Sequence, residues 1–295
     1  MLELTLFNFA LLLVIAAGLV IVKKKVKSEK AQNILLLSSA IFTILCHYSS
    51  LLYHHLTLGD AFTYLRHNPN LILPIYPCNV VMWSCLIFGI MKNKGSGIGK
   101  LLSDYIFWFG IFSTLVGMFA NVDFIRNPTL ADFDITKGIV AHATLLFNVM
   151  LIPLFGKVNL NFGRNMKNMI YSVIGMYAIG LYCNLVFEAL VSKDMAYQVN
   201  SMFIIHSPFD GLDFLTYPTI AGIALALYFV TFAICDVKAH KKGERWFDKA
   251  LEIAKAKIIK KTTRNLKLDT KKQRQTKNRG SQMDDILNGE FEKHR

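Results

Sequence analysis

Seven long apolar stretches alternate with polar connections over the first 235 residues of the chain. Each stretch comes close to the roughly 20 residues that an α-helix needs to cross the hydrocarbon core of a bilayer. A soluble core could hide one or two such stretches, but not seven. The pattern therefore predicts an all-α integral membrane protein, built as a seven-transmembrane-helix bundle. The predicted helices cover residues 5–22, 31–53, 71–91, 101–120, 137–156, 168–191 and 212–235.

The charges in the connections predict how this bundle is oriented. Basic residues gather in the connections at 23–30, 92–100 and 157–167. In the intervening connections Arg66 stands alone, and Arg126 is outnumbered by acidic neighbours. Cytoplasmic loops of membrane proteins carry the excess of lysine and arginine. We therefore expect the N-terminus outside, the C-terminus in the cytoplasm and the protein in the plasma membrane of the cell.

The composition agrees with a membrane protein and changes the meaning of its positive charge. The chain is 53% hydrophobic, with a mean hydropathy of +0.38 and a formal net charge of +13. More than half of its 33 lysine and arginine residues follow residue 235, next to the inner face of the bilayer. Anionic lipids of that leaflet attract such segments. We therefore expect the excess charge to contact anionic inner-leaflet lipids and not nucleic acid.

The sequence divides into two parts at the end of the last stretch. Residues 1–236 form the expected transmembrane domain, and residues 237–295 form a basic cytoplasmic tail. Within the tail, apolar residues recur at helical spacing over 244–261, with lysines between them. This pattern predicts an amphipathic helix lying on the inner leaflet. Beyond it the chain is polar and poor in aromatic residues, and we expect it to be disordered.

Polar residues inside the apolar stretches are costly and usually mark function. They gather in the outer halves of the stretches, whereas the inner halves hold few of them. Counted from the outer ends of their stretches, Cys78 and His142 differ in depth by about 3 Å at the rise of an α-helix. Pro74 and Pro77 precede Cys78, and proline both kinks a helix and removes a backbone donor. The pattern places a thiol beside a helix break, at the depth of an imidazole.

A thiol within reach of an imidazole is the minimal activated nucleophile, because the histidine accepts the proton and the thiolate attacks an acyl carbonyl. Cys78 and His142 are therefore a candidate catalytic pair. Two simpler interpretations stay open. A buried cysteine commonly acts as a small hydrophobic residue, and a membrane histidine commonly joins helices by hydrogen bonds. The candidate binding and oxyanion residues near the pair are Asn79, Tyr76, Asn184, Asn200, Glu188 and Tyr217.

Three segments of the chain resemble the YwaF family of bacterial integral membrane proteins. They are LPIYPC at 73–78, the region of His142 in the fifth stretch, and NSMFIIHSP at 200–208. The resemblance covers residues 1–235 and leaves out the tail.

The family's animal relatives include a membrane acyltransferase that moves fatty acyl chains onto ether lysophospholipids. The resemblance implies that Cys78 and His142 correspond to the catalytic cysteine and histidine of that enzyme. The chain departs from the family pattern at Tyr76, Pro77 and Ser201, where histidine, leucine and tyrosine are usual.

Three functional hypotheses follow from these observations. The first is a membrane-embedded lipid acyltransferase or acyl hydrolase that acts on a phospholipid or another acyl-lipid in the outer-leaflet half. The second is a transporter or permease component, which polar groups through the inner halves would favour. The third is a scaffold or sensor without catalysis. We expect no metal site, because His47, His54 and His55 lack the spacing of metal ligands. We also expect no cofactor, since the seventh stretch lacks the lysine that retinal would require.

Overall fold

The computed structural model describes residues 2–59, 61–119, 129–158, 160–208 and 211–263. Every regular element that these residues form is a helix, and six of the helices are long and apolar enough to cross a bilayer. The prediction of an all-α, multi-pass membrane protein is therefore confirmed. The six are α1 (Leu2–Lys25), α2 (Glu29–Leu58), α5 (Gly97–Phe119), α7 (Phe133–Leu154), α8 (Phe162–Leu190) and α10 (Tyr217–Ala239).

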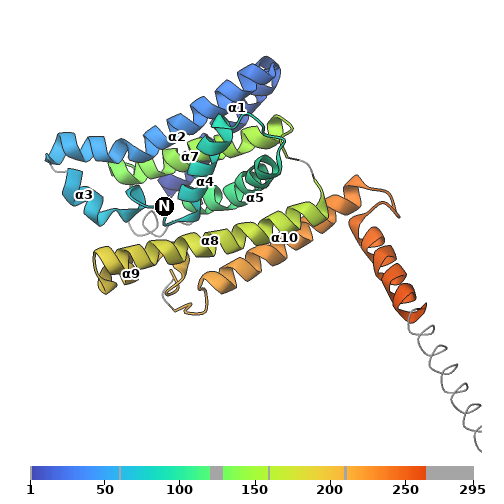
Figure 1. The fold of residues 1–295 in the computed structure, drawn as a ribbon. Helices are drawn as coiled ribbons and strands as arrows, with labels where there is room; N and C mark the ends of the chain where they lie inside the picture. The colour runs from blue at the N-terminus through green and yellow to red at the C-terminus, as the bar shows by residue number, and fades with distance from the viewer. Residues whose placement is uncertain (1, 60, 120–128, 159, 209–210, 264–295) are drawn as a thin grey trace, which may run out of the picture. The chain divides into compact units, whose positions relative to one another are not determined.

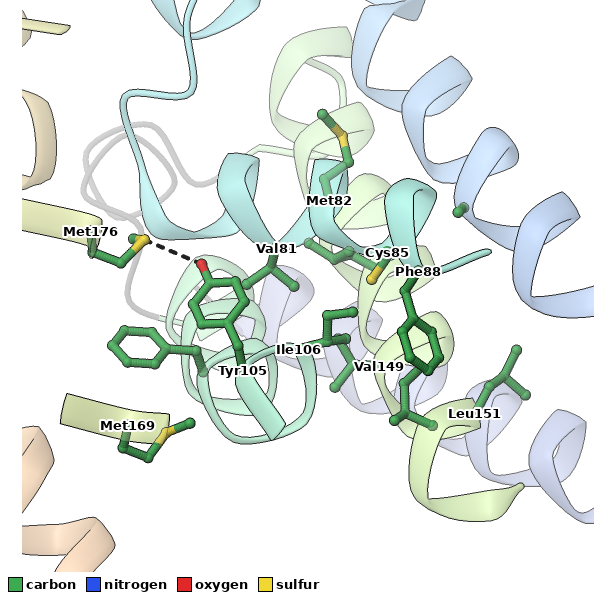
Figure 2. Close-up of a cluster of buried hydrophobic side chains, with 14 of the residues drawn as sticks. Val81, Met82, Cys85, Phe88, Tyr105, Ile106, Val149, Leu151, Met169 and Met176 are labelled. Atoms are coloured by element: carbon green, nitrogen blue, oxygen red, sulfur yellow. Dashed lines mark hydrogen bonds between the residues drawn. The ribbon is translucent and has the colours of Figure 1, made fainter. Parts of the chain in front are cut away.

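The chain forms two compact units, Met1–Ala233 and Ile234–Arg295. In the first unit, α1, α2, α5 and α7 pack together with the shorter helix α4 (Pro77–Ile90), as Figure 1 shows. Their buried residues form one apolar core. In Figure 2, Val81 and Phe88 of α4 meet Ile106 of α5 and Val149 of α7. Burying such aliphatic and aromatic side chains together gives helices in a bilayer the close packing that holds them side by side.

Helices α8 and α10 run beside one another and pack on α5 (Figure 1). The Phe162 and Phe229 rings lie 5.3 Å apart between α8 and α10. Two tyrosines join this pair of helices to α5. The Tyr105 hydroxyl donates to Met176 Sδ at 3.2 Å (Figure 2), and the Tyr228 hydroxyl donates to Trp108 O at 2.8 Å.

The third apolar stretch departs from the prediction. A transmembrane helix was expected over residues 71–91, but α4 covers only the 14 residues Pro77–Ile90. It is preceded by a 3-10 turn, η1 (Pro69–Leu71), and by non-helical residues up to Tyr76. A proline disfavours helical backbone at the residue before it, and its fixed φ suits the first turn of a helix. Pro77 therefore begins α4 and excludes Tyr76, which is extended at φ −119° and ψ 155°.

Short helices form part of the connections that follow α2 and α8. Helix α3 (Ala61–His67) follows α2, and α9 (Lys193–Val199) with the 3-10 turn η2 (Ser201–Phe203) follows α8. Gly59, with φ +69°, ends α2, and the Asp132 carboxylate begins α7 by accepting the Asp134 and Ile135 amides. Arg126 and its acidic neighbour Asp123, on which part of the orientation argument depends, lie outside the described residues.

In the second unit, residues 246–263 are helical. The segment expected to be amphipathic, 244–261, overlaps this range. The Asp236 carboxylate caps the helix by accepting the Trp246 amide at 2.8 Å, and it also contacts His240 Nδ1 at 3.2 Å. Residues 264–295, where disorder was predicted, lie outside the described residues.

Candidate functional site

Cys78 lies in the first turn of α4, directly after the break at Tyr76. Its thiol is partly buried and contacts the backbone N–H groups of Cys78 and Asn79. The first N–H groups of a helix have no partners within the helix and carry partial positive charge. They stabilise a nearby anion. The break made by Pro77 therefore places the Cys78 thiol beside the N–H groups of a helix start, of which the Asn79 N–H also donates to Tyr76 O at 3.0 Å.

A second segment, distant in sequence, closes over this break. Two groups of η2 donate to the carbonyl oxygen of Ile75: the Met202 amide at 2.9 Å and the Ser201 hydroxyl at 3.0 Å. A helix break inside a membrane protein requires such partners, because lipid offers none to the freed backbone groups. The two sequence segments that carried the family resemblance, 73–78 and 200–208, are therefore in direct contact.

Asn184 of α8 holds the same segment from the other side. Its Oδ1 accepts the Ser201 amide at 2.8 Å, and its Nδ2 donates to Ser201 O at 3.4 Å. Both residues are buried, Ser201 completely. The side-chain amide of Asn184 therefore accepts from the N–H and donates to the C=O of the same residue, as a neighbouring β-strand does in a sheet. Asn184 thus positions η2 on the start of α4.

The backbone of η2 adopts an uncommon conformation. Asn200, Met202 and Phe203 have φ angles of 42°, 56° and 58°. Asparagine tolerates this left-handed region, whereas methionine and phenylalanine rarely adopt it. The fold supports the conformation at Asn200, whose Oδ1 accepts the Ile205 and His206 amides. Such backbone strain concentrates where the surrounding structure holds a segment in place for function.

His142 is held on α7 by a hydrogen bond and by a close helix contact. Its Nδ1 lies 2.8 Å from Gly138 O. Because a carbonyl oxygen only accepts, Nδ1 carries the proton and Nε2 keeps its lone pair. The ring fills the space that a side chain at Gly117 of α5 would need, since a Cβ there would lie 2.2 Å from His142 Nε2. Among the described residues, no hydrogen bond joins His142 to Cys78.

The other predicted site residues fall into two groups. Tyr76, Asn79, Asn184 and Asn200 gather at the start of α4 and on the segment that covers it. Asn79 Oδ1 accepts the Tyr76 amide at 3.2 Å, and the Tyr76 and Phe203 rings lie 5.9 Å apart. Asn79 is thus buried at the break, with its Oδ1 used to begin the helix.

Glu188 and Tyr217 lie elsewhere. Glu188 is exposed near the end of α8 and forms a 3.8 Å ion pair with Lys193. Tyr217 begins α10, and its hydroxyl donates to Val173 O of α8. Both contacts are of a structural kind, joining neighbouring elements.

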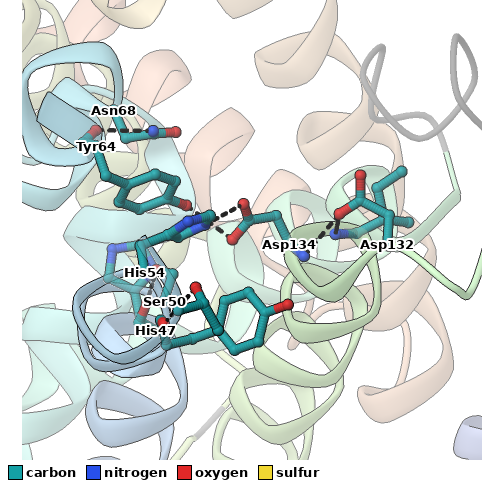
Figure 3. A network of polar contacts seen from close by, with 10 residues as sticks. His47, Ser50, His54, Tyr64, Asn68, Asp132 and Asp134 are labelled. Carbon is teal, nitrogen blue, oxygen red and sulfur yellow. Dashed lines mark hydrogen bonds and ion pairs between the residues drawn. The ribbon is translucent and has the colours of Figure 1, made fainter. Parts of the chain in front are cut away.

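A polar network that the sequence did not predict joins α2, α3 and the start of α7 (Figure 3). His54 Nε2 and the Tyr64 hydroxyl each contact one oxygen of the Asp134 carboxylate, both at 2.8 Å. The pKa of Tyr64 is raised, first by burial and further by Asp134, so its hydroxyl stays a donor. His54 and Asp134 are 80 residues apart, and no local spacing relates them.

A second unpredicted cluster lies between α5 and α8. Asp104 is only 1% exposed, and its Oδ2 accepts from Asn168 Nδ2 at 2.7 Å. Arg164 Nε lies 3.4 Å from the same oxygen. The cluster lies near the ends of α5 and α8 that adjoin the basic connections 92–100 and 157–167. A buried acid needs such partners, because an isolated carboxylate is costly to remove from water.

No group of three histidine, cysteine, aspartate or glutamate side chains suited to a metal ion occurs within the described ranges. A family model described as the TMEM164 family matches residues 2–236. The chain belongs to the TMEM164 family. The match covers every helix of the first unit, including the α4 break, η2 and the His54–Asp134 network. No curated protein and no solved structure matches the chain.

Proposed function

We propose that this TMEM164-family protein is a membrane-embedded acyltransferase or acyl hydrolase in which Cys78 is the nucleophile and His142 the base. The observation that carries the proposal is the position of Cys78. Its thiol contacts two backbone N–H groups in the first turn of α4, beside a break that a remote segment closes. Reactive cysteines characteristically occupy such helix starts, because the N–H groups stabilise the thiolate.

Helix lengths support a shared depth for the pair. The 14 residues of α4 rise about 21 Å, against roughly 30 Å for the hydrocarbon core. If α4 ends at the inner boundary, beside the basic connection 92–100, Cys78 lies about 10 Å below the outer boundary. His142 lies about 13 Å along α7 from Phe133, the first residue of that helix. A short α4 therefore lowers Cys78 to the level of His142.

Each residue has a defined task in this proposal. His142 Nε2, which keeps its lone pair, takes the thiol proton, and Cys78 Sγ attacks the ester carbonyl of an acyl-lipid. The proton then passes to the departing alkoxide as the carbon–oxygen bond breaks. The N–H groups at the start of α4 and the Asn79 amide face the developing oxyanion. Asn184 and Asn200 act indirectly, because their side chains hold η2 in place.

The proposal extends to the substrate and the membrane. The acyl donor is a phospholipid or another acyl-lipid of the outer leaflet. The protein lies in the plasma membrane, with its N-terminus outside the cell and its C-terminus in the cytoplasm. Seven spans, α4 included, satisfy that orientation. The resemblance of segments 73–78 and 200–208 to YwaF-type proteins, and through them to an animal ether-lysophospholipid acyltransferase, would imply the same chemistry. The tail would bind anionic inner-leaflet lipids.

Active-site labelling tests this function. The full chain in lipid nanodiscs is treated with a thiol-directed acyl probe, and the labelled residue is mapped by mass spectrometry. We expect label on Cys78, loss of label in Cys78→Ala and His142→Ala, and no additivity between the two changes, since both disable one step. Cys85→Ala is the matched control, because Cys85 lies on the same helix within the apolar core. Label on another cysteine, or label unaffected by His142→Ala, refutes the proposal.

Solute transport is a second candidate, and one observation favours it. The Asp104 cluster places a buried acid and two amides in the inner part of the bundle, where a translocation path needs polar groups. Asn165 supplies the second amide, beside the Asp104 carboxyl. Flux assays in proteoliposomes with Asp104→Asn separate the two functions. Transport requires that this change alter flux, whereas acyl transfer at Cys78 requires that it leave probe labelling intact.

A further inference from the structure

Lys137 carries a positive charge with which no acid among the described residues forms an ion pair. It lies on α7, four residues after Phe133, and its side chain is partly buried. Within the described ranges it forms no hydrogen bond either. A lysine inside a membrane span almost always has a partner, because its charge is costly in hydrocarbon. We therefore expect Lys137 to pair with a group that the chain does not supply.

The acids at the start of α7 are engaged elsewhere. Asp134 precedes Lys137 by three residues, so the two side chains are neighbours on the helix surface. Both oxygens of its carboxylate are used, however, one by His54 Nε2 and the other by the Tyr64 hydroxyl (Figure 3). Asp134 attracts Lys137 only from beyond the length of an ion pair. Asp132 uses its carboxylate to begin the helix.

The side chains grouped with Lys137 are imidazoles. His47 of α2 and His142 of α7 both lie within electrostatic range of the Lys137 ammonium. His47 also lies within range of His142, so the three side chains gather where α2 packs on α7. An imidazole cannot neutralise an ammonium, because it is either uncharged or positive. The cluster is therefore suited to an anionic ligand.

The position of Lys137 along α7 suits the phosphate of a lipid. Lys137 lies about 6 Å along the helix from Phe133, and His142 lies about 13 Å along it. Helical side chains lean toward the N-terminus of their helix, which for α7 is the outer end in the proposed orientation. The ammonium thus extends toward the lipid headgroups, as lysines near the ends of spans do. A glycerophospholipid bound there by its phosphate has its ester carbonyls one glycerol unit deeper, toward His142.

We propose that Lys137 binds the phosphate of the acyl-lipid substrate, and that this contact selects phospholipids over neutral acyl-lipids such as diacylglycerols. The inference rests on the proposed function, because it assigns a headgroup contact to the lipid whose ester Cys78 attacks. An ammonium binds a phosphate oxygen through a charge-assisted hydrogen bond, which is stronger than one between neutral groups. Lys137 is a binding residue here and takes no part in the chemistry.

Binding of lipids with identical acyl chains tests the contact without turnover. The full chain in dodecyl maltoside micelles is titrated with a phosphatidylcholine and with the corresponding diacylglycerol, and bound lipid is counted by native mass spectrometry. Phosphatidylcholine has no net charge for the basic tail to attract. The wild type should prefer it by about 10-fold or more, the worth of one hydrogen bond to a charged group. Lys137→Gln should lose the preference, whereas Lys137→Arg keeps the charge and should retain it.

Lys193→Gln is the matched control, because it removes the same charge from an exposed lysine at the start of α9. Its preference should equal that of the wild type. Lys137→Met, which keeps the length of the side chain, replaces Lys137→Gln if that variant does not fold. Glycerol phosphate separates a lipid headgroup from a free phosphate ester, and at equal concentration it should not displace the lipid.

Four results overturn the inference. They are equal affinity of the wild type for both lipids, a preference that survives loss of the Lys137 charge or disappears in Lys137→Arg, an equal loss in Lys193→Gln, and displacement by equimolar glycerol phosphate.

The assay keeps this inference separate from the function of Cys78. Binding needs no thiol, so Cys78→Ala should keep the preference for phosphatidylcholine. If Cys78 is never acylated, the proposed function fails, and the lipid preference still decides the Lys137 site. If phosphatidylcholine and diacylglycerol acylate Cys78 equally fast, the proposed function stands and the phosphate contact fails.

Discussion

The segment that closes the α4 break packs against Gly180 of α8. Substitution of this glycine by alanine tests how closely the two elements are packed. A Cβ at this position would lie 2.6 Å from Met202 Cγ, 2.7 Å from Ile204 Cδ1 and 2.8 Å from Met202 Cβ. All three distances are shorter than non-bonded carbon atoms allow. Gly180→Ala must therefore push η2 away from α8 or force Met202 out of its buried position.

The expected cost follows from overpacking. Adding a methyl group to a closely packed site costs about 1–3 kcal/mol, and the helix preference of alanine over glycine returns up to about 1 kcal/mol. Gly175→Ala isolates the second effect, because Gly175 lies on the same helix and a Cβ there would have no neighbouring atom within 4 Å. We expect Gly180→Ala to be less stable than Gly175→Ala by about 1–3 kcal/mol, or roughly 2–5 °C in Tm.

Thermal unfolding of the two variants in the same lipid, followed by circular dichroism, measures this difference. Probe labelling of Cys78 should fall in Gly180→Ala as well, since η2 bonds the carbonyl of Ile75 just before the nucleophile. The reasoning would be refuted if both variants unfolded at the same temperature, or if Gly180→Ala were destabilised while labelling of Cys78 stayed at the wild-type rate.

Three further predictions follow. Gly117→Ala should displace the His142 ring, whose Cδ2 would lie 2.1 Å from the new Cβ, and should slow acylation of Cys78 by about 100-fold; Gly222→Ala, in open space, is the control. A peptide covering residues 240–262 should become helical on anionic vesicles and lose affinity as salt rises; affinity that does not change with salt contradicts lipid electrostatics as the cause. A single cysteine placed at Lys24 should react only from the cytoplasmic side, and reaction from outside would reverse the proposed topology.

The sequence predicted the membrane helices well because hydrophobic length is a property of one segment at a time. Six of the seven apolar stretches form helices long enough to cross a bilayer. The ends were less accurate, since capping contacts extend several helices beyond their apolar residues. Helix α2, for example, continues to Leu58 although the apolar stretch was placed at 31–53. Polar residues can continue a helix beyond its apolar stretch, because the backbone hydrogen bonds within the helix do not depend on the side chains.

The α4 break was signalled in part by the sequence. Pro74 and Pro77 indicated an interruption, but the hydropathy of the surrounding residues still favoured a full-length span. What closes the break could not be read from the sequence, because the hydrogen bond from Ser201 to Ile75 joins residues 126 positions apart. The depth match between Cys78 and His142 was counted from an outer end of the third stretch that is not helical. The start of α4 at Pro77 therefore changes the basis of that count.

The polar clusters were the least predictable features. His54 was considered as a metal ligand and set aside for its spacing, and that spacing carries no information about a partner such as Asp134. Asp104 was overlooked because a single acid near the end of an apolar stretch resembles an ordinary boundary residue. Only the packing of α8 on α5, which brings Asn168 and Arg164 to it, shows that Asp104 is buried.

The contact between Ile75 and η2 has a consequence for how the protein is made. While the chain is being synthesised, α4 leaves the ribosome long before residues 200–203 exist, and the backbone groups of its break then have no partners. Lipid cannot supply them. The start of α4 should therefore enter the hydrocarbon core only after α8 and η2 have been synthesised. Chains that end before residue 200 should be recognised as unfinished by the proteases that survey the membrane.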